Sequence, residues 1–283
     1  MEIVFEDRGM ILRSGNSTTL VISDIHLGIE EEISEEKGVY FPLQHANILE
    51  RVRTLVIKYE VSQLYIIGDI KHTILTDVPY NWDIVPEFMS KLSNMVDTAV
   101  IPGNHDGDLE ALLPRSVTMT DVRGIVIGEG KERVGLLHGH SWPNPVILES
   151  SWIIAGHSHP AVSRFRVVSN PKLGRSEMRR FAGSVPVILQ SKLSKNCVRR
   201  HMGLLEIDDD DRAVFVTLPS FNQLISGLAI NSSQSKMQGP FFENGCANFI
   251  DSEVYSTDGL FLGTVEWMRE RSNEMIKSNP TGD

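Results

Sequence analysis

The sequence predicts an α/β fold in which two β-sheets pack face to face and helices cover the outside. Two observations support this prediction. In the first half of the 283-residue chain, short apolar runs alternate with segments of helical spacing, a pattern typical of parallel strands joined by helices. From residue 122 onward, short strands and glycine-containing turns follow one another, which is typical of a mostly antiparallel sheet. Because no linker separates the halves, we expect a single domain over residues 1–283.

The first half is expected to begin with a β-hairpin and to continue as strands alternating with helices. Residues 2–12 form the hairpin, with Asp7-Arg8-Gly9 as its turn. Aliphatic runs bounded by turn residues predict strands at 18–23, 63–67 and 98–101. The expected helices are 43–60, 83–96 (with Asp83 as N-cap and Pro86 in the first turn) and a short one at 107–113.

The second half is expected to consist mainly of strands. Their ranges are 122–127, 133–137, 151–155, 162–168, 185–189, 203–207 and 213–218. The acidic run 208–211 is interpreted as a hairpin turn, and a strand pair is expected around Asp258-Gly259. The chain then ends in a helix over about 264–277. The C-terminal extension, about 226–283, is a candidate interface with a second copy or another protein.

Composition excludes several classes of protein. The longest apolar run falls short of the roughly 18 residues that a membrane-spanning helix needs. The N-terminus carries early acids and lacks the basic and apolar regions of a signal peptide, so a cytoplasmic location is expected. Cys197 and Cys246 are far apart and form no CxxC motif, so neither a disulfide framework nor a zinc knuckle is expected.

The net charge of −10 conceals a basic block over residues 164–201. This block holds ten Lys or Arg and a single acid, Glu177, which amounts to a net charge of +9. It begins five residues after the last of the motifs described below, so its start lies close to them. Two interpretations stay open: the block neutralises the phosphates of a polynucleotide, or its charges pair with the acidic remainder of the chain.

Five predicted strands end in a cluster of Asp, Asn or His residues. In open α/β sheets, ligand sites form beyond the carboxyl ends of the strands. One histidine at a strand end is more often an ordinary hydrogen-bonded residue than a ligand, but five such strand ends reverse that expectation. The clusters are Asp24-Ile25-His26, Asp69, Asn104-His105-Asp106, His138 and His157-Ser158-His159.

These clusters supply seven candidate ligands without a thiolate: Asp24, His26, Asp69, Asn104, His138, His157 and His159. A mixed oxygen and nitrogen set suits manganese, and also iron or zinc, better than calcium. Seven ligands exceed the needs of one catalytic ion but suit two ions that share a bridging carboxylate. Such a pair, about 3.5–4 Å apart, clamps a phosphoryl group and activates a bridging water for in-line attack.

His105 remains available for proton transfer because it adjoins a candidate ligand without being one. We expect it to act as the general acid for the leaving alkoxide, with Asp106 orienting its ring and keeping it protonated. His72 and His140 are expected either to orient the ligands or to be simple neighbours of the site. Together with Arg164, Arg179 and Arg180 they are the candidate substrate contacts.

The ordered pattern DxH…GD…GNHD…H…GHxH, over residues 24–159, resembles the calcineurin-like metallophosphoesterase superfamily. The resemblance implies a four-layer αββα sandwich and His105 as the catalytic histidine. It also implies one metal held by Asp24, His26, Asp69 and His159, and a second held by Asp69, Asn104, His138 and His157.

Further segments narrow the resemblance. DIHLG with the following Gly38 and Pro42, GDIKH, and LPSFNQLISGLAIN are similar to an archaeal group related to DNA-repair nucleases. Bacterial phosphoesterases encoded beside a DNA ligase are also similar, and the resemblance extends to about residue 265. The chain departs from many superfamily members in carrying Lys71 and His72 after Gly68-Asp69-Ile70, which leaves the role of these two residues open.

The favoured function is a dinuclear-metal phosphodiesterase or nuclease that acts on DNA, RNA or nucleotides, with no membrane association. A small-molecule phosphomonoesterase is the alternative within the same chemistry, and a non-catalytic scaffold is the alternative outside it. The chain has no GxxxxGK[ST] loop, so any ATP dependence would come from a partner in a repair complex.

Overall fold

The structure of the chain is a computed structural model that describes residues 1–74, 79–170, 175–207 and 212–277. For residues 165–170, 175–181 and 273–277 it describes the backbone. The expected turn at 208–211 lies outside the described residues.

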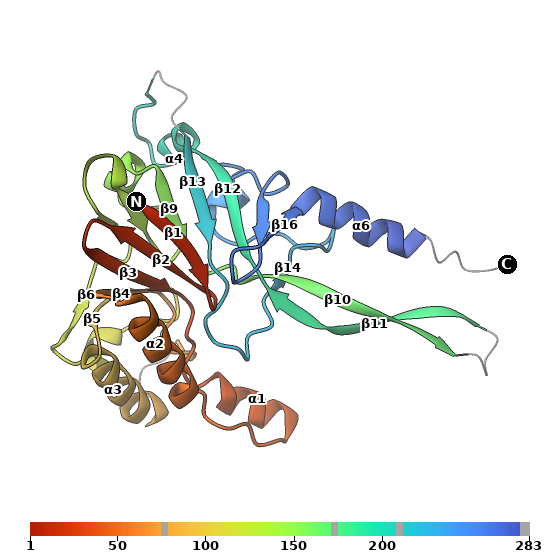
Figure 1. The fold of residues 1–283 in the computed structure, drawn as a ribbon, viewed down its shortest axis with the longest axis horizontal. Helices are drawn as coiled ribbons and strands as arrows, with labels where there is room; N and C mark the ends of the chain where they lie inside the picture. The colour runs from red at the N-terminus through yellow and green to blue at the C-terminus, as the bar shows by residue number, and fades with distance from the viewer. Residues whose placement is uncertain (75–78, 171–174, 208–211, 278–283) are drawn as a thin grey trace.

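The first sheet has six strands that follow one another in sequence order (Figure 1). They are β1 (Glu2–Glu6), β2 (Gly9–Ser14), β3 (Ser17–Ile22), β4 (Gln63–Ile67), β5 (Asp97–Ile101) and β6 (Val117–Met119). The first three pair antiparallel, and β3 to β6 run parallel. Asp7 and Arg8, with φ angles of 44° and 68°, form the left-handed hairpin turn that matches strand twist. The expected hairpin and strand–helix series are confirmed.

The second sheet has seven strands in the order β16-β15-β12-β13-β9-β8-β7. Their bounds are β7 (Ile125–Ile127), β8 (Val134–Leu136), β9 (Trp152–Ala155), β12 (Ile188–Ser194), β13 (Arg212–Thr217), β15 (Glu253–Tyr255) and β16 (Phe261–Thr264). Four of the six pairs are antiparallel, as expected, whereas β9 runs parallel to both β8 and β13. The carboxyl end of β9 therefore lies at the same edge as those of its two neighbours.

Alternating side chains of the central strands produce four layers. On β3, Leu20 and Ile22 are fully buried against the helices α2 (His45–Tyr59) and α3 (Pro79–Ser93). Val21, between them, faces the second sheet and packs in one core with its residues Ile154 and Val216. The outer face of the second sheet is covered by η3 (Pro145–Glu149), α4 (Lys195–His201) and α5 (Pro240–Glu243). The expected αββα sandwich is confirmed.

Several element boundaries differ from expectation. The helix expected from Asp83 begins at Pro79, a residue favoured in a first turn, so Asp83 and Pro86 lie inside α3. The helix expected at 107–113 is a single 3-10 turn, η1 (Leu109–Leu112). Residues 204–207 form no strand, because Gly203 adopts a φ of 70° and the chain leaves α4 as a loop. Helix α1 (Ile29–Lys37), strand β6 and helix α4 were not expected.

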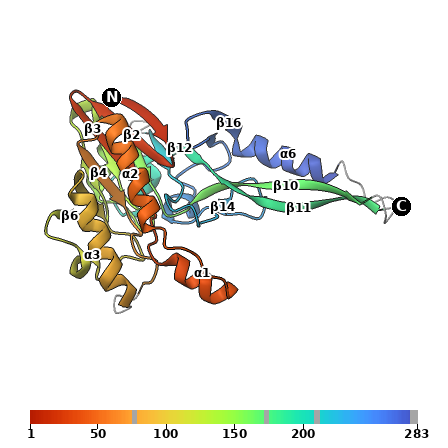
Figure 2. The same ribbon diagram turned by 60° about the horizontal axis from the view of Figure 1, so that its bottom comes forward.

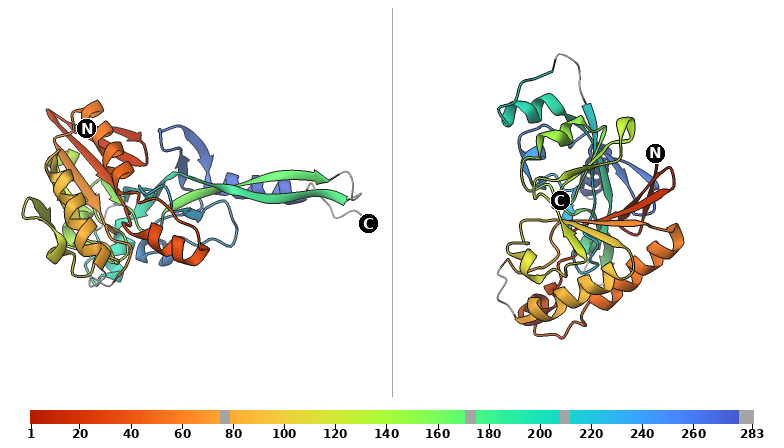
Figure 3. Two further views of the ribbon diagram at one scale, coloured as in Figure 1. Left: turned by 90° about the horizontal axis from the view of Figure 1, so that it is seen from below. Right: turned by 90° about the vertical axis from the view of Figure 1, so that its left-hand side faces the viewer.

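A long hairpin extends from the sandwich. It is formed by β10 (Pro160–Asn170) and β11 (Arg175–Pro186), and β10 also pairs with β14 (Leu228–Ala229). Figures 1 and 2 show β10 and β11 reaching well beyond the sheets, and Figure 3 shows them again from below. Helix α6 (Val265–Lys277), the expected terminal helix, runs in the same direction. We call β10 and β11 the arm.

The expectation that the cysteines are not paired is wrong. Cys197 on α4 and Cys246 after α5 form a disulfide with a Cα–Cα separation of 5.3 Å. The two cysteines are 49 positions apart in the sequence, with strand β13 of the second sheet between them, and packing of α4 and α5 on that sheet brings the two sulfurs together. Within the described ranges, the helices fall short of the length and hydrophobicity that a bilayer crossing requires.

Candidate metal centre

The seven candidate ligands meet where strands of the two sheets end. Asp24 and His26 follow β3, Asp69 follows β4, and Asn104 follows β5. His138 follows β8, and His157 and His159 follow β9. A pocket of about 330 Å³ opens over them and is lined by five of the seven, by His105 and by residues near β14. Tertiary packing of the two sheets thus brings together motifs that are up to 135 residues apart in the sequence.

One group of ligand atoms comes from Asp24, His26 and His159. These atoms lie within 4.8 Å of one another. Nε2 of His159 is 3.0 Å from Oδ1 of Asp24, yet this nitrogen is buried without a hydrogen bond among the described residues. Nε2 of His26 is also buried without a hydrogen-bond partner there. A cation bound beside the buried carboxylate would satisfy these two imidazole nitrogens, which otherwise lack a hydrogen bond.

A second group comes from Asp69, Asn104, His138 and His157. Nε2 of His138 lies 3.1 Å from Oδ1 of Asn104 and 3.4 Å from Oδ2 of Asp69. The ligand atoms of Asp69, His138 and His157 lie within 4.8 Å of one another. Oδ2 of Asp69 is also 3.5 Å from Nε2 of His26, which belongs to the first group. Asp69 therefore lies between the two groups, as a shared ligand would.

The backbone at these ligands is strained. Five of the seven have positive φ angles between 42° and 67°: Asp24, His26, Asp69, His157 and His159. Residues other than glycine rarely adopt this region, at a cost of roughly 1–3 kcal/mol each. Strain at five ligands, and at four other residues elsewhere in the described chain, indicates that the surrounding structure is built to present these side chains.

Glycines beside the ligands allow ligand side chains to approach the backbone closely. A Cβ at Gly68 would lie 2.1 Å from Nδ1 of His138, and one at Gly103 would lie 2.2 Å from Oδ1 of Asp69. Any side chain at these positions would displace a ligand. These glycines therefore provide clearance for the ligand side chains.

Burial and neighbouring charges set the protonation states of the ligands. Burial lowers the pKa of His26 to about 3 and that of His157 to about 4, so both imidazoles are neutral. For Asp24, burial alone would raise the pKa, but His159 and His138 outweigh it and the pKa is lowered. The pKa of Asp69 is lowered in the same way, chiefly by His138. Neutral imidazoles and ionised carboxylates are the forms that bind metal ions.

His138 differs from the other histidines. Its ring is fully buried, and its Nδ1–H donates to the carbonyl of Ile67 over 3.0 Å. Burial would lower its pKa, but the carboxylates of Asp69 and Asp24 raise it to about 9. In the metal-free protein a proton on Nε2 therefore neutralises part of the carboxylate charge. The two orphaned nitrogens, the carboxylate of Asp69 near both groups and this replaceable proton fit divalent cations.

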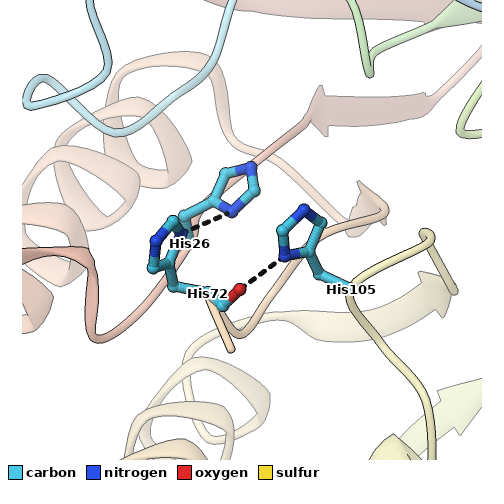
Figure 4. A group of neighbouring side chains, drawn as sticks. All are labelled: His26, His72 and His105. Carbon is cyan, nitrogen blue, oxygen red and sulfur yellow. Dashed lines mark hydrogen bonds between the residues drawn. The ribbon is translucent and has the colours of Figure 1, made fainter. Parts of the chain in front are cut away.

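A chain of hydrogen bonds links His26 to His72 and then to Glu32. Nδ1 of His26 lies 3.3 Å from Nδ1 of His72 (Figure 4). Nε2 of His72 lies 2.7 Å from Oε2 of Glu32. If His72 donates to Glu32, it accepts from Nδ1–H of His26, and Nε2 of His26 is left with its lone pair toward the pocket. His72 thus lies beside the centre as expected. Glu32, on the unexpected helix α1, was missed because it carries no motif.

His105 is oriented by backbone groups. Its Nδ1–H donates to the carbonyl of His72 (Figure 4). Its backbone N–H donates to Oδ1 of Asp69 over 2.9 Å. Its Nε2 lies 4.0 Å from Oδ2 of Asp69, and both residues line the pocket. The expected contact between Asp106 and this ring does not fit, because the carboxylate of Asp106 accepts backbone N–H groups of Ile70, Lys71 and Gly103 instead.

Lys71 is fully buried although it carries a charge. Its ammonium group donates to the carbonyls of Thr73, Ile74 and His105. Burial lowers its pKa, but three carbonyl acceptors compensate for much of the lost hydration. Lys71 therefore ties the segment after Asp69 to the loop that carries His105.

Side chains of the segment 219–222 donate hydrogen bonds to the backbone of the first motif. Oγ of Ser220 donates to the carbonyl of Asp24 over 2.6 Å, and Nδ2 of Asn222 donates to that of Ile25 over 2.8 Å. Asn222 is fully buried. The sequence suggested LPSFN only as part of a resemblance, and these bonds explain why its polar residues lie there.

The remaining candidate substrate contacts lie in different places. The ring centroids of His140 and His138 lie 5.2 Å apart. Burial lowers the pKa of His140 to about 4. Arg164 is exposed on β10, while Arg179 and Arg180 belong to β11, where the structure describes the backbone.

The basic block does not form one surface. Its first part lies on the arm. Its last part lies on α4, where Arg199 is 9% exposed and Arg200 forms a 2.9 Å ion pair with Glu206. Figure 1 shows α4 on a different side of the molecule from the arm. Only the arm therefore remains a candidate surface for phosphates.

Comparisons with known proteins agree with this geometry. The model of the calcineurin-like phosphoesterase family matches residues 17–173. No curated protein sequence matches the chain. A nuclease named MPE from Pseudomonas putida is 18% identical, with a TM-score of 0.50 over 92% of this chain and 99% of that chain.

Two other solved structures are similar over about half of this chain. YfcE, a phosphoesterase from E. coli, is 21% identical over 52% of this chain and 73% of that chain, with a TM-score of 0.33. An archaeal phosphodiesterase is 16% identical over 53% of this chain and 78% of that chain, with a TM-score of 0.31. At such identities, structural likeness speaks to the fold alone.

Proposed function

Because the chain belongs to the calcineurin-like phosphoesterase family and is thus a hydrolase of phosphoesters, we propose that it is a dinuclear phosphodiesterase acting on nucleic acid. The observation that carries this proposal is the position of Asp69 between two groups of ligand atoms, with Nε2 of His105 4.0 Å away. A single-ion site would need neither the second group nor the shared carboxylate.

The ligands divide between two ions according to their contacts. Asp24, His26 and His159 would hold one ion, Asn104, His138 and His157 the other, and both would share Asp69. Bound there, two divalent ions would neutralise phosphoryl oxygens and activate a water for in-line attack. We propose manganese for both positions, because a mixed carboxylate, amide and imidazole set suits it.

The protein itself supplies proton transfer and orientation. We assign to His105 the transfer of a proton from Nε2 to the leaving oxygen, because His105 lines the pocket and its other ring nitrogen, Nδ1, is engaged by the carbonyl of His72. The carbonyl of His72 accepts from Nδ1–H of His105 and keeps the ring in that orientation. Lys71 holds the backbone of His105 in place. Asp106 acts one step further away, by fixing the backbone of Ile70, Lys71 and Gly103.

The arm supports a polynucleotide as substrate. Its strand β10 begins at Pro160, immediately after His159, and pairs with Leu228, which lines the pocket. In the register of the arm, Arg166 lies directly opposite Arg180. Like charges at directly opposite positions destabilise a strand pair, and an anion bound between them would offset this repulsion. Consecutive phosphates of a substrate leaving the pocket would supply such anions.

Hydrolysis by reconstituted protein tests the chemistry. Metal-free protein is loaded with manganese and assayed on single- and double-stranded DNA, RNA, cyclic nucleotides, bis-(p-nitrophenyl) phosphate and phosphomonoesters. We expect diester cleavage that Asp69→Ala and His138→Ala abolish and that the exposed control Asp97→Ala leaves unchanged. Turnover of monoesters alone would establish a phosphomonoesterase instead. Normal metal content without any turnover would establish a scaffold.

Charge reversal on the arm tests the substrate class. In Arg166→Glu/Arg180→Glu we expect weaker binding of single-stranded DNA and a salt slope that falls by about one for each lost phosphate contact. Arg53→Glu/Arg200→Glu is the matched control, since it makes the same change of charge on α2 and α4. An unchanged rate and salt slope on the arm variant would exclude the arm as the binding surface.

Two further parts of the proposal concern the setting of the enzyme. We propose a homodimer, or contact with a repair partner, through residues 226–283, where Leu260, Phe261 and Trp267 are 65%, 54% and 48% exposed. Sedimentation velocity across a dilution series tests the homodimer. We also propose a cytoplasmic location. The test is the fraction of Cys197 and Cys246 that is found as free thiols in fresh extracts.

A further inference from the structure

We propose that Cys197, His201 and Cys246 form a separate metal site when the protein is reduced. The three ligand atoms lie within 4.8 Å of one another, on the opposite face of the second sheet from the sandwich core. This proposal is independent of the phosphoesterase function, because none of these residues belongs to the centre described above.

The local structure presents the three side chains together. Cys197 and His201 are four residues apart on α4, so they share one face of the helix. The N-cap residue Ser194 accepts a hydrogen bond from the backbone N–H of Cys197 and fixes the start of this helix. Cys246 reaches the same face from the chain after α5 and is 2% exposed. Two cysteines and one histidine are a ligand set that zinc sites in proteins use.

The imidazole is held in position although it is exposed. Its ring stacks on Trp142, with centroids 5.4 Å apart and planes inclined by 12°. Trp142 in turn packs edge-to-face on Phe241 of α5, at 5.5 Å. A disulfide needs no histidine beside it, so the disulfide alone does not account for this arrangement. The carbonyl oxygen of Asn244 lies 4.0 Å from Sγ of Cys197 and adds an oxygen near the same point.

The chemistry of the site requires a reductant and a soft cation. A dithiol reduces the Cys197–Cys246 bond: it supplies two electrons and two protons, and is itself oxidised to a disulfide. The two resulting thiols lose their protons when zinc binds, and His201 binds as the neutral imidazole. Two thiolates and an imidazole favour zinc, whereas the oxygen and nitrogen set of the other centre favours manganese. The chain would thus hold two kinds of metal in separate places.

The site would keep one wall of the active-site pocket in place. Cys246 ends a segment that begins at Gln238, which lines the pocket and whose carbonyl accepts from Oγ of Ser158. The disulfide ties this segment to α4. In a reducing compartment that covalent link is lost, and a bound zinc ion would replace it.

Cobalt spectroscopy distinguishes this site from the other one. Full-length metal-free protein is reduced with dithiothreitol, desalted without oxygen and titrated with cobalt. Only thiolate ligands give sulfur-to-cobalt charge-transfer absorption in the near ultraviolet, and the other centre has no thiolates. We expect this absorption in reduced protein, with one more cobalt ion bound per chain than in oxidised protein, and its loss when zinc is added.

Variants and the oxidised protein provide the controls. Oxidised wild-type protein differs from the reduced protein only in its disulfide, and it should show cobalt bound only through oxygen and nitrogen. Cys197→Ser and Cys246→Ser should remove the charge-transfer absorption and keep the cobalt uptake of the active site, which also reports that the protein is folded. His201→Asn should weaken cobalt binding at least tenfold. No charge-transfer absorption in reduced protein, or unchanged binding in His201→Asn, would overturn the proposal.

Discussion

Nδ1 of His72 lies 3.3 Å from Nδ1 of His26, and this contact connects a residue outside the ligand set to one inside it. Glu32 completes the chain at 2.7 Å from the far nitrogen of His72. A carboxylate–histidine–histidine sequence of this kind fixes the tautomer of the ligand and makes it a better donor to the metal. The contact also gives the unusual GDIKH segment a physical role, since His72 belongs to it.

Removing His72 should weaken metal binding without changing the ligand set. For His72→Ala we expect a loss of roughly 10–100-fold in manganese affinity, the usual effect of losing a residue that orients a ligand. Glu32→Gln should act in the same direction but less strongly. The measurement is a manganese titration followed by electron paramagnetic resonance. His45→Ala on α2 is the control, and equal affinities for it and His72→Ala would contradict the assignment.

Replacing His105 should affect poor leaving groups most. If Nε2 of His105 donates the proton, His105→Asn should lower kcat on alkyl diesters such as DNA by about 10²–10⁴-fold. An aryl diester has a leaving group that needs little protonation, so its kcat should fall much less. Parallel assays on DNA and on bis-(p-nitrophenyl) phosphate measure this difference. An equal loss on both substrates would show that His105 acts in binding rather than in proton transfer.

Metal uptake should depend on pH through His138. The carboxylates of Asp69 and Asp24 raise the pKa of His138 to about 9, so below that pH a metal ion must displace a proton. Affinity should therefore rise with pH by up to about tenfold per unit and level off above pH 9. His26 and His157, with pKa values lowered to about 3 and 4, are already neutral and should not contribute near neutral pH.

Calorimetry in buffers of different ionisation enthalpy measures the protons released per manganese ion. We expect close to one proton per chain at pH 7 from the His138 position. His138→Gln should bind manganese more weakly and release fewer protons. Proton release that is zero in the wild type would show that His138 is neutral in the metal-free protein.

Removing the buried charge of Lys71 should destabilise the protein. Lys71→Met leaves the carbonyls of Thr73, Ile74 and His105 without their donor, and the loss of a hydrogen bond to a charged group costs about 1.5–3 kcal/mol. We expect the free energy of unfolding to fall by at least about 2 kcal/mol in urea denaturation of the metal-free protein. Lys91→Met removes an exposed lysine that pairs with Glu87 and should change it by about 0.5 kcal/mol or less.

Local patterns predicted the elements that depend on neighbouring residues. The hairpin at Asp7-Arg8, the strands before Asp24 and Asp69, and the terminal helix all follow from turn residues and side-chain periodicity. The start of α3 was missed because Asp83 has the residue type of an N-cap, while the helix already begins at Pro79. The loop at 204–207 was read as a strand because it is apolar enough to suggest one.

Local sequence patterns could not predict which atoms form hydrogen bonds with one another. Asp106 stands beside His105 in the sequence, yet its carboxylate turns toward backbone N–H groups, and the ring of His105 meets a carbonyl of His72 instead. His105 and Asp106 lie in a turn after β5, where the local backbone path decides the direction of each side chain, so adjacency in sequence is a poor guide to side-chain contact.

By itself, the sequence determined the ligand types and the strand ends that carry them, because both depend on residue identity and local periodicity. Only the tertiary structure decided how these ligands divide, with Asp69 between two groups and His72 behind one of them. It also decided that Cys197 meets Cys246. Such contacts arise from the packing of one sheet on another, which brings together residues whose separation along the chain carries no information about distance.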